Sequence, residues 1–170
     1  MIELSEKDFI QVKNDFTVLS VSIDPEFAKE HNIDISKIKT GKQCLIDFTA
    51  TIKFDKNEVD VSYSDKNVTN KETFFKELNN TLNWIELNNN KINNSICDKL
   101  LPLKNEKWCF VDENKHTNES FIKKIGKLKS ILFITGDNCK IYINDNGLFK
   151  SHDIEVEILK ETIKDINIVG

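Results

Sequence analysis

The sequence predicts one α+β domain: an antiparallel β-hairpin, then three helices, then a C-terminal antiparallel β-meander. Polar and apolar residues alternate on both sides of a short turn within residues 46–63, and they alternate again at 140–143 and at 154–158. From 69 to 126, apolar residues recur at helical spacing. Strands and helices in separate consecutive blocks are typical of α+β proteins. A chain of 170 residues without a repeat or a flexible linker is expected to form a single domain over residues 1–170.

The hairpin is the clearest element of the sequence. In residues 46–54 every even position is apolar and every odd position is polar, and after Asp55-Lys56-Asn57 the alternation resumes. This pattern indicates two antiparallel strands with one solvated face. The first forty residues are less patterned, and there we expect a short helix from Ser5 through Val12, a strand at 16–21 and a helical turn begun by Asp24-Pro25.

Three helices are expected next. Thr69 and Glu72 have the spacing of a capping box, which predicts a helix start there. Asn88-Asn89-Asn90 should separate this helix from a second one, because Asn favours caps and turns. Pro102 should help to end the second helix, and Gly126 should end a third one, which begins at Asn118.

The C-terminal meander contains one strand that is expected to be central. Ile131-Leu132-Phe133-Ile134 is apolar on both faces, which is typical of such a strand. Asp145-Asn146-Gly147 predicts a turn, because Asn and Gly tolerate positive φ. His152 then precedes the alternating strand 154–158. We interpret His152 as a half-buried residue, hydrogen bonded to the backbone where that strand enters the sheet.

The composition excludes several classes of partner. All 24 basic residues are lysine, and the net charge is −4. Arginine supplies bidentate contacts to phosphate and guanine, so its absence argues against nucleic-acid binding, whereas a cationic partner is electrostatically favourable. No apolar run approaches the ~20 residues of a membrane helix, and the N-terminus is too acidic for a secretory signal. We expect a cytoplasmic protein without a membrane partner.

The cysteines carry no recognisable metal or redox motif. Cys44, Cys97, Cys109 and Cys139 form no Cys-x-x-Cys pair and lie at no zinc-ligand spacing from a histidine. In a cytoplasmic chain these thiols should be reduced and mostly buried. We therefore predict no metal site, no cofactor and no enzymatic activity.

The residues expected to contact a partner are mostly acidic. Carboxylates suit a surface that blocks the basic cleft of a toxin nuclease, and they occur here at the hairpin and on the polar face of the meander. A partly exposed Trp can anchor an interface. The predicted partner-binding set is Asp55, Glu58, Asp60, Asp65, Glu155, Glu157, Trp84 and His152.

Two stretches of the chain resemble the bacterial domain-of-unknown-function family numbered 2262. Leu100–Trp108 has two leucines ahead of a Leu-x-Asn-x-x-Trp element, and Leu148–Val156 has Leu-Phe followed by His-x-Ile-x-Val. The chain has Lys150-Ser151 where that family has Trp-Gly. The resemblance covers about residues 96–170 and implies a fold rather than a reaction. Within the first stretch, Asn105 is expected to satisfy backbone groups in a fixed turn.

Three functional hypotheses follow. Small proteins of this kind often look like immunity proteins, so the leading one is a non-enzymatic protein that occludes a bacterial toxin stoichiometrically. The alternative is a small enzyme centred on His152, with Asp145 or Cys139 nearby in space. The third is a scaffold domain, which an exposed apolar patch would favour. Nothing in the sequence specifies an oligomeric state.

Overall fold

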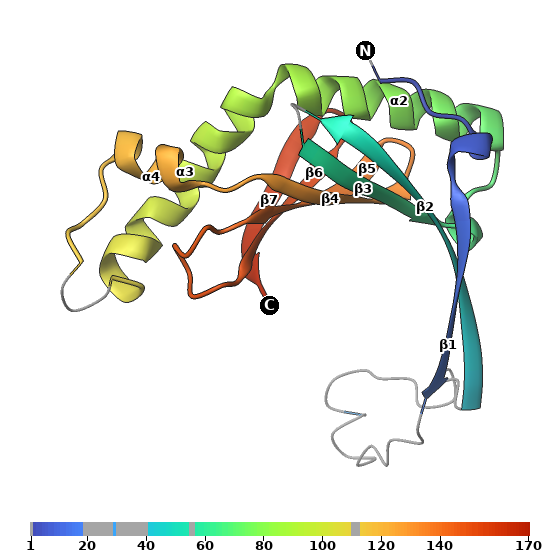
Figure 1. The fold of residues 1–170 in the computed structure, drawn as a ribbon, viewed down its shortest axis with the longest axis horizontal. Helices are drawn as coiled ribbons and strands as arrows, with labels where there is room; N and C mark the ends of the chain where they lie inside the picture. The colour runs from blue at the N-terminus through green and yellow to red at the C-terminus, as the bar shows by residue number, and fades with distance from the viewer. Residues whose placement is uncertain (1, 19–28, 30–40, 55–56, 110–112) are drawn as a thin grey trace.

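The structure, a computed structural model, describes residues 2–18, 29, 41–54, 57–109 and 113–170, with the backbone alone at 14–18, 41–46 and 67. Figure 1 shows its helices and strands. In chain order, with η for a 3₁₀ helix, they are η1 (Glu6–Asp8), β1 (Ile10–Val18), β2 (Gly41–Phe54), β3 (Asn57–Ser64), η3 (Asp65–Asn67), α2 (Lys71–Leu87), α3 (Asn89–Lys107), α4 (Asn118–Lys124), β4 (Leu128–Thr135), β5 (Asn138–Asn144), β6 (Asp153–Leu159) and β7 (Thr162–Val169).

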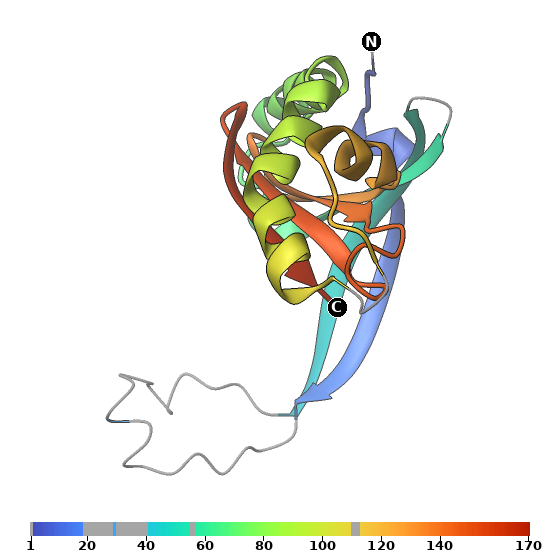
Figure 2. The same cartoon turned by 90° about the vertical axis from the view of Figure 1, so that its left-hand side faces the viewer.

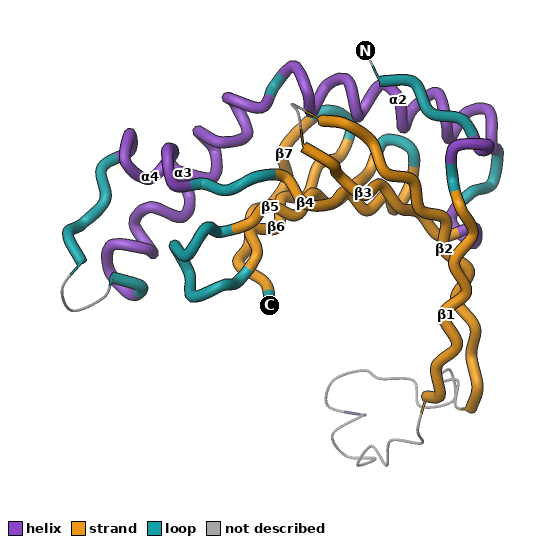
Figure 3. The backbone as a smooth tube through the Cα atoms, in the orientation of Figure 1, coloured by secondary structure: helices purple, strands orange, loops and turns teal. Residues whose placement is uncertain are grey.

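The strands form one seven-stranded sheet in the order of the chain, from β1 to β7 (Figure 3). Neighbouring strands are antiparallel except β3 and β4, which are parallel. The segment that contains α2, α3 and α4 connects these two strands, since a parallel pair requires a long crossover. The predicted order of hairpin, helices and meander is confirmed, and the parallel pair joins both β regions in one sheet.

The helices cover one face of the sheet. Figures 1 and 2 show α2 and α3 along this face, and α4 packs against α3. The strand residues that face the helices are buried, as in β3, where Val59, Val61 and Tyr63 alternate with more exposed polar residues. The core therefore lies between the sheet and the helices. None of the described helices is long and apolar enough to cross a membrane.

Helix α2 begins one residue later than the capping-box spacing predicts. Asn70 is the N-cap, and its Oδ1 accepts a hydrogen bond from the backbone N–H of Thr73 at 2.9 Å. Asn is at least as favourable at this position as Thr, so the helix start moves from Thr69 to Asn70. The predicted break between the first two helices is confirmed at Asn88, whose side chain donates to the Trp84 carbonyl.

The prediction that Pro102 ends the second helix is wrong, because α3 continues to Lys107. A proline inside a helix removes one N–H and crowds the preceding turn, at a cost of about 3 kcal/mol. Pro102 itself is exposed, whereas Leu100 and Lys104 on either side of it are buried. Burial of these neighbours offsets the local cost, so the helix runs past the proline.

The N-terminal prediction is partly wrong. Ser5 does cap a single helical turn, η1, but the chain then enters β1 at Ile10 instead of continuing as a helix. Pairing explains the difference, since β1 is in register with β2 along its whole length. The strand expected at 16–21 is described as far as Val18, and the turn expected at Asp24-Pro25 lies outside the described residues.

The third helix ends just before Gly126, as predicted, with Lys124 as its last residue and Ile125 as its C-cap. The N–H of Gly126 donates to the Asn144 carbonyl at 2.9 Å. A Cβ at this position would overlap the same backbone carbonyl. Gly126 is therefore needed for the close approach of the chain after α4 to the end of β5.

Candidate functional site

The sheet face that is turned away from the helices carries most of the predicted acidic residues. Register pairs place one row of residues across β2 to β6: Thr51, Asp60, Ser130, Tyr142 and Glu155. A second row crosses β1 to β6: Ile10, Thr49, Ser62, Leu132, Lys140 and Glu157. Alternate residues of a strand share a face, and the residues between these rows are largely buried under the helices. We call the surface formed by the two rows the open face.

The open face brings together carboxylates that are far apart in the sequence. Asp60 and Glu155 lie in the same row, three strand spacings or about 14 Å apart. Glu58 lies two residues before Asp60 on β3, and Glu157 two residues after Glu155 on β6, so both share this orientation. Two lysines share the surface: Lys140 in the second row, and Lys53, which lies opposite Glu58. The four carboxylates outnumber these two lysines, so the surface is acidic.

Glu155 is less accessible than its position on a solvated face predicts, with 9% of its surface exposed. Its carboxylate accepts a hydrogen bond from Lys140 Nζ at 3.0 Å, and this bond raises the pKa of Lys140. Burial, and then a hydrogen bond with Glu155, raise the pKa of Tyr142. Glu155 is thus held by two neighbours, whereas Glu58 and Asp60 are exposed.

The open face also has an apolar part. Strand β4 is central, as predicted, but the described residues cover only one of its two apolar faces. Leu132 is 38% exposed as a result, and β1 adds Ile10 and Val12, which are 74% and 39% exposed. Exposed apolar side chains therefore lie beside carboxylates and hydroxyls on this face.

The other four predicted partner-binding residues are Asp55, Asp65, Trp84 and His152. Asp55 lies outside the described residues, and the other three are not part of the open face. Asp65 is exposed in η3, where its charge acts on Lys71. Trp84 is half-buried in α2, and Lys91 Nζ lies 5.7 Å from the centroid of its ring.

His152 lies where the two family-like stretches meet. Its ring packs edge-on against Trp108 with centroids 5.4 Å apart, and Trp108 packs in the same way against Phe149 at 5.8 Å. The Phe149 carbonyl lies 2.6 Å from His152 Nδ1. Because a carbonyl can only accept, the proton is on Nδ1, and Nε2 of the neutral ring is an acceptor. The predicted backbone bond of His152 and its position just before β6 are both confirmed.

Asp145 and Cys139, the partners considered for a catalytic His152, have other surroundings. The Asp145 carboxylate accepts hydrogen bonds from the N–H groups of Gly147 and Phe149 at 3.1 and 2.6 Å, which closes the predicted turn. Cys139 is buried, and this burial raises the pKa of its thiol to about 12. Among the described residues, no hydrogen bond joins His152 to a carboxylate, hydroxyl or thiol, and no group of three His, Cys, Asp or Glu is placed to hold a metal ion.

Cys139 is expected to resist alkylation in the folded protein. A thiol reacts as its thiolate, and a raised pKa together with burial leaves little thiolate in contact with solvent. Treatment with iodoacetamide at about pH 8, followed by site-resolved mass spectrometry, should find the half-buried Cys109 modified well before Cys139. In the denatured chain the two cysteines should be modified at similar rates. Equal rates in the folded chain would contradict the burial of Cys139.

The end of α3 holds a buried polar network that sequence reasoning missed. Lys104 is fully buried, and its Nζ donates to Glu113 Oε2 at 2.6 Å and to the Trp108 carbonyl at 2.8 Å. The other oxygen of Glu113 lies 2.9 Å from His116 Nε2. Lys104 occurs four residues after the core residue Leu100 and therefore lies on the apolar stripe of α3. This spacing is the sequence signal from which its burial could have been predicted.

Asn105 fixes the turn after α3, as predicted. Its side chain donates to the His116 carbonyl at 2.9 Å and accepts from the His116 N–H at 2.8 Å. Ser120 Oγ lies 3.4 Å from His116 Nδ1. This hydroxyl also accepts from the Thr117 N–H at 2.9 Å in a capping box, so its role at the start of α4 is structural.

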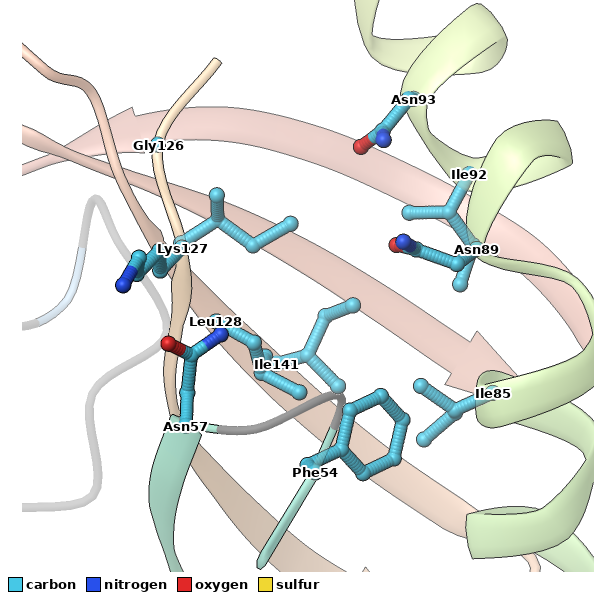
Figure 4. Close-up of a pocket in the computed structure, with 11 residues that line it drawn as sticks. Phe54, Asn57, Ile85, Asn89, Ile92, Asn93, Gly126, Lys127, Leu128 and Ile141 are labelled. Carbon is cyan, nitrogen blue, oxygen red and sulfur yellow. The ribbon is translucent and has the colours of Figure 1, made fainter.

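Two cavities flank the helix layer. One of about 480 Å³ lies between α3 and β7 and is bordered by Trp108 and His152. The other, of about 120 Å³, lies beside the first turns of α3, where Asn89 and Asn93 face Phe54 across the hollow (Figure 4). Small-molecule sites usually enclose about 300–1,000 Å³, so the second cavity is too small to be one.

Comparison with known proteins identifies the family. The profile of a family described as "uncharacterized protein conserved in bacteria" (DUF2262) matches residues 34–168, most of the chain. The chain belongs to this family. The DUF2262 match starts well before residue 96 and therefore includes β2, β3 and α2, which the two recognised stretches do not reach. Searches among curated proteins and among solved structures found no match.

Proposed function

We propose that this DUF2262 protein is a non-enzymatic binding protein, an immunity protein that neutralises a cationic bacterial toxin by covering its active site. The open face is the observation that supports this most: Glu58, Asp60 and Glu157 lie with the exposed Leu132 on one surface that the described residues leave uncovered. A toxin that cleaves nucleic acid needs a basic cleft, which carboxylates complement. The protein would act in the cytoplasm without a cofactor, nucleic acid or membrane partner.

The size of the open face suits a protein partner. Six spacings of about 4.8 Å between seven strands, and about seven residues at 3.3 Å along each, give roughly 670 Å² of flat area. A standard interface buries about 800 Å² on each partner. A single toxin domain that covered this face would therefore make a contact of ordinary size.

The exposed carboxylates and the apolar group should contribute differently. Glu58 and Asp60 are solvated, so they should mainly speed the association and make it depend on salt. Leu132 should contribute by burial, at about 25 cal/mol for each Å² removed from water. If the charges of the face were reversed, the partner would be repelled, and Leu132 would then not be buried against it either.

Co-expression with the product of the adjacent open reading frame tests the proposal. That product should stop growth of a bacterial host when expressed alone, and this DUF2262 protein should restore growth. The double substitution Glu58→Lys, Asp60→Lys should abolish the rescue, because it turns an attractive contact into a repulsive one. The purified pair should form a one-to-one complex by size-exclusion chromatography with light scattering.

The matched control is Asp98→Lys, Glu106→Lys, which makes the same change of charge on exposed positions of α3. This control should rescue growth as well as the natural chain. Rescue by the Glu58→Lys, Asp60→Lys variant would argue against the open face as the contact. A harmless neighbouring product, with no tight partner captured from the native host, would argue against the immunity function itself.

A further inference from the structure

We propose that the groove between α3 and the outer edge of β7 binds an extended peptide segment of another protein, which joins the sheet beside β7. This proposal is independent of the open face, because it concerns the edge of the sheet and its helix-covered side. Three observations carry it: a strand edge with no partner among the described residues, a cavity directly beside that edge, and an apolar wall on the opposite side of the cavity.

The outer edge of β7 has no strand partner among the described residues. There β7 pairs with β6 alone, so alternate residues turn their N–H and C=O groups outward. Proteins usually guard such edges with charges and bulges. Here the charged Lys164 and Asp165 and the register shift opposite Glu157 all fall in the first half of the strand. The residues from Ile166 to Val169 carry no charge.

The cavity of about 480 Å³ borders this same half of the strand. Three consecutive residues, Ile166 to Ile168, line it. Because neighbouring strand residues point to opposite faces, a cavity that touches all three must border the backbone edge. The opposite wall is formed by Leu100 and Leu103 of α3. The groove therefore offers, on one side, backbone groups that pair with no other described strand and, on the other side, apolar side chains.

The ends of the groove are fixed by side-chain contacts. At one end, Lys99 of α3 pairs with Asp165 of β7, and this contact lowers the pKa of Asp165 to about 2. At the other end are Trp108 and His152. The hydrogen bond from Nδ1 to the Phe149 carbonyl holds the His152 ring at the border of the cavity.

An extended peptide fits both walls at once. Its backbone can pair with the outward N–H and C=O groups of β7, while alternate side chains enter the cavity against Leu103 and Trp108. The uncharged half of β7 is about 13 Å long at 3.3 Å per residue, which suits a segment of about four residues. The occupant should carry a large aliphatic or aromatic side chain at the cavity position.

A displayed library of random short peptides, screened on the full chain, tests the proposal. Recovered sequences should share one large apolar position, and synthetic copies should bind in fluorescence anisotropy. Methylating alternate backbone nitrogens of such a peptide should weaken binding about tenfold or more in one register, because each methyl removes a strand hydrogen bond. Methylation in the other register should have little effect.

Variants of the protein make the second arm of the test. Leu103→Lys places a charge in the cavity and should weaken the same peptide about tenfold or more, whereas Leu87→Lys, at a leucine that is 84% exposed on α2, should not. Circular dichroism should show both variants folded. The proposal is overturned if no peptide is enriched, if methylation in neither register matters, or if Leu103→Lys binds as well as Leu87→Lys.

Discussion

Replacement of Phe149 by alanine is expected to lower the free energy of unfolding by about 4 kcal/mol. The side chain is fully buried and packs edge-on against Trp108 at 5.8 Å and Phe121 at 6.2 Å. It thus joins the end of α3, helix α4 and the loop before β6. These three segments are tied by separate hydrogen bonds, so they cannot all move inward to fill the space. Urea denaturation followed by circular dichroism measures the loss.

The control for Phe149→Ala is Leu87→Ala, at a side chain that is 84% exposed. This change should stay within about 0.5 kcal/mol of the natural chain. The hydrogen bond of His152 should survive in Phe149→Ala, because the acceptor is the backbone carbonyl. A loss below about 1 kcal/mol at Phe149 would contradict its place in the core.

Local patterns predicted the elements around Phe149 but not the contacts among them. The turn at Asp145 and the strand that begins after His152 follow from turn chemistry and from period-two alternation. The contact between Trp108 and Phe149 joins a helix end to a loop that lies beyond α4, β4 and β5 in the chain. No sequence periodicity connects positions that far apart, so this junction had to come from the structure.

The open face could likewise be predicted only in part from the sequence. Glu58 with Asp60, and Glu155 with Glu157, were each predicted on the polar side of their own strands. The parallel pairing of β3 with β4, which sets Asp60 opposite Ser130, brings these carboxylates onto one surface. The register of that pair depends on how α2 and α3 pack in the crossover. The alternation within each strand does not specify this register.

Two of the wrong predictions, at Pro102 and after Ser5, share one physical cause, which is that burial or pairing overrides local preference. Pro102 disfavours a helix interior, but burial of its neighbours keeps α3 intact. Ser5 suits a helix start, but pairing with β2 draws the chain into β1 from Ile10. In each case the local preference amounts to about 1–3 kcal/mol, which is less than burial of two or three side chains can supply.

Replacing the two partners of the Lys104–Glu113 pair one at a time should lower the free energy of unfolding by unequal amounts. Glu113→Gln should lower the free energy of unfolding by about 3 kcal/mol, because it leaves the fully buried ammonium without this carboxylate. Lys104→Met should cost less, since methionine has a similar shape and removes the buried charge. The Glu113 side chain is 19% exposed, so its carboxylate can be hydrated when Lys104 is gone.

The exposed pair Lys123–Glu119 on α4 provides the control, because both of its side chains are more than two-thirds exposed. Glu119→Gln should change the free energy of unfolding by less than about 0.5 kcal/mol, and high salt should remove even that. The loss at Glu113 should persist at high salt, since water and ions do not reach Lys104. If Glu113→Gln were as mild as Glu119→Gln, the ammonium of Lys104 would have to be solvated. The end of α3 would then be open to water, and the wall that Trp108 forms beside the groove would be mobile.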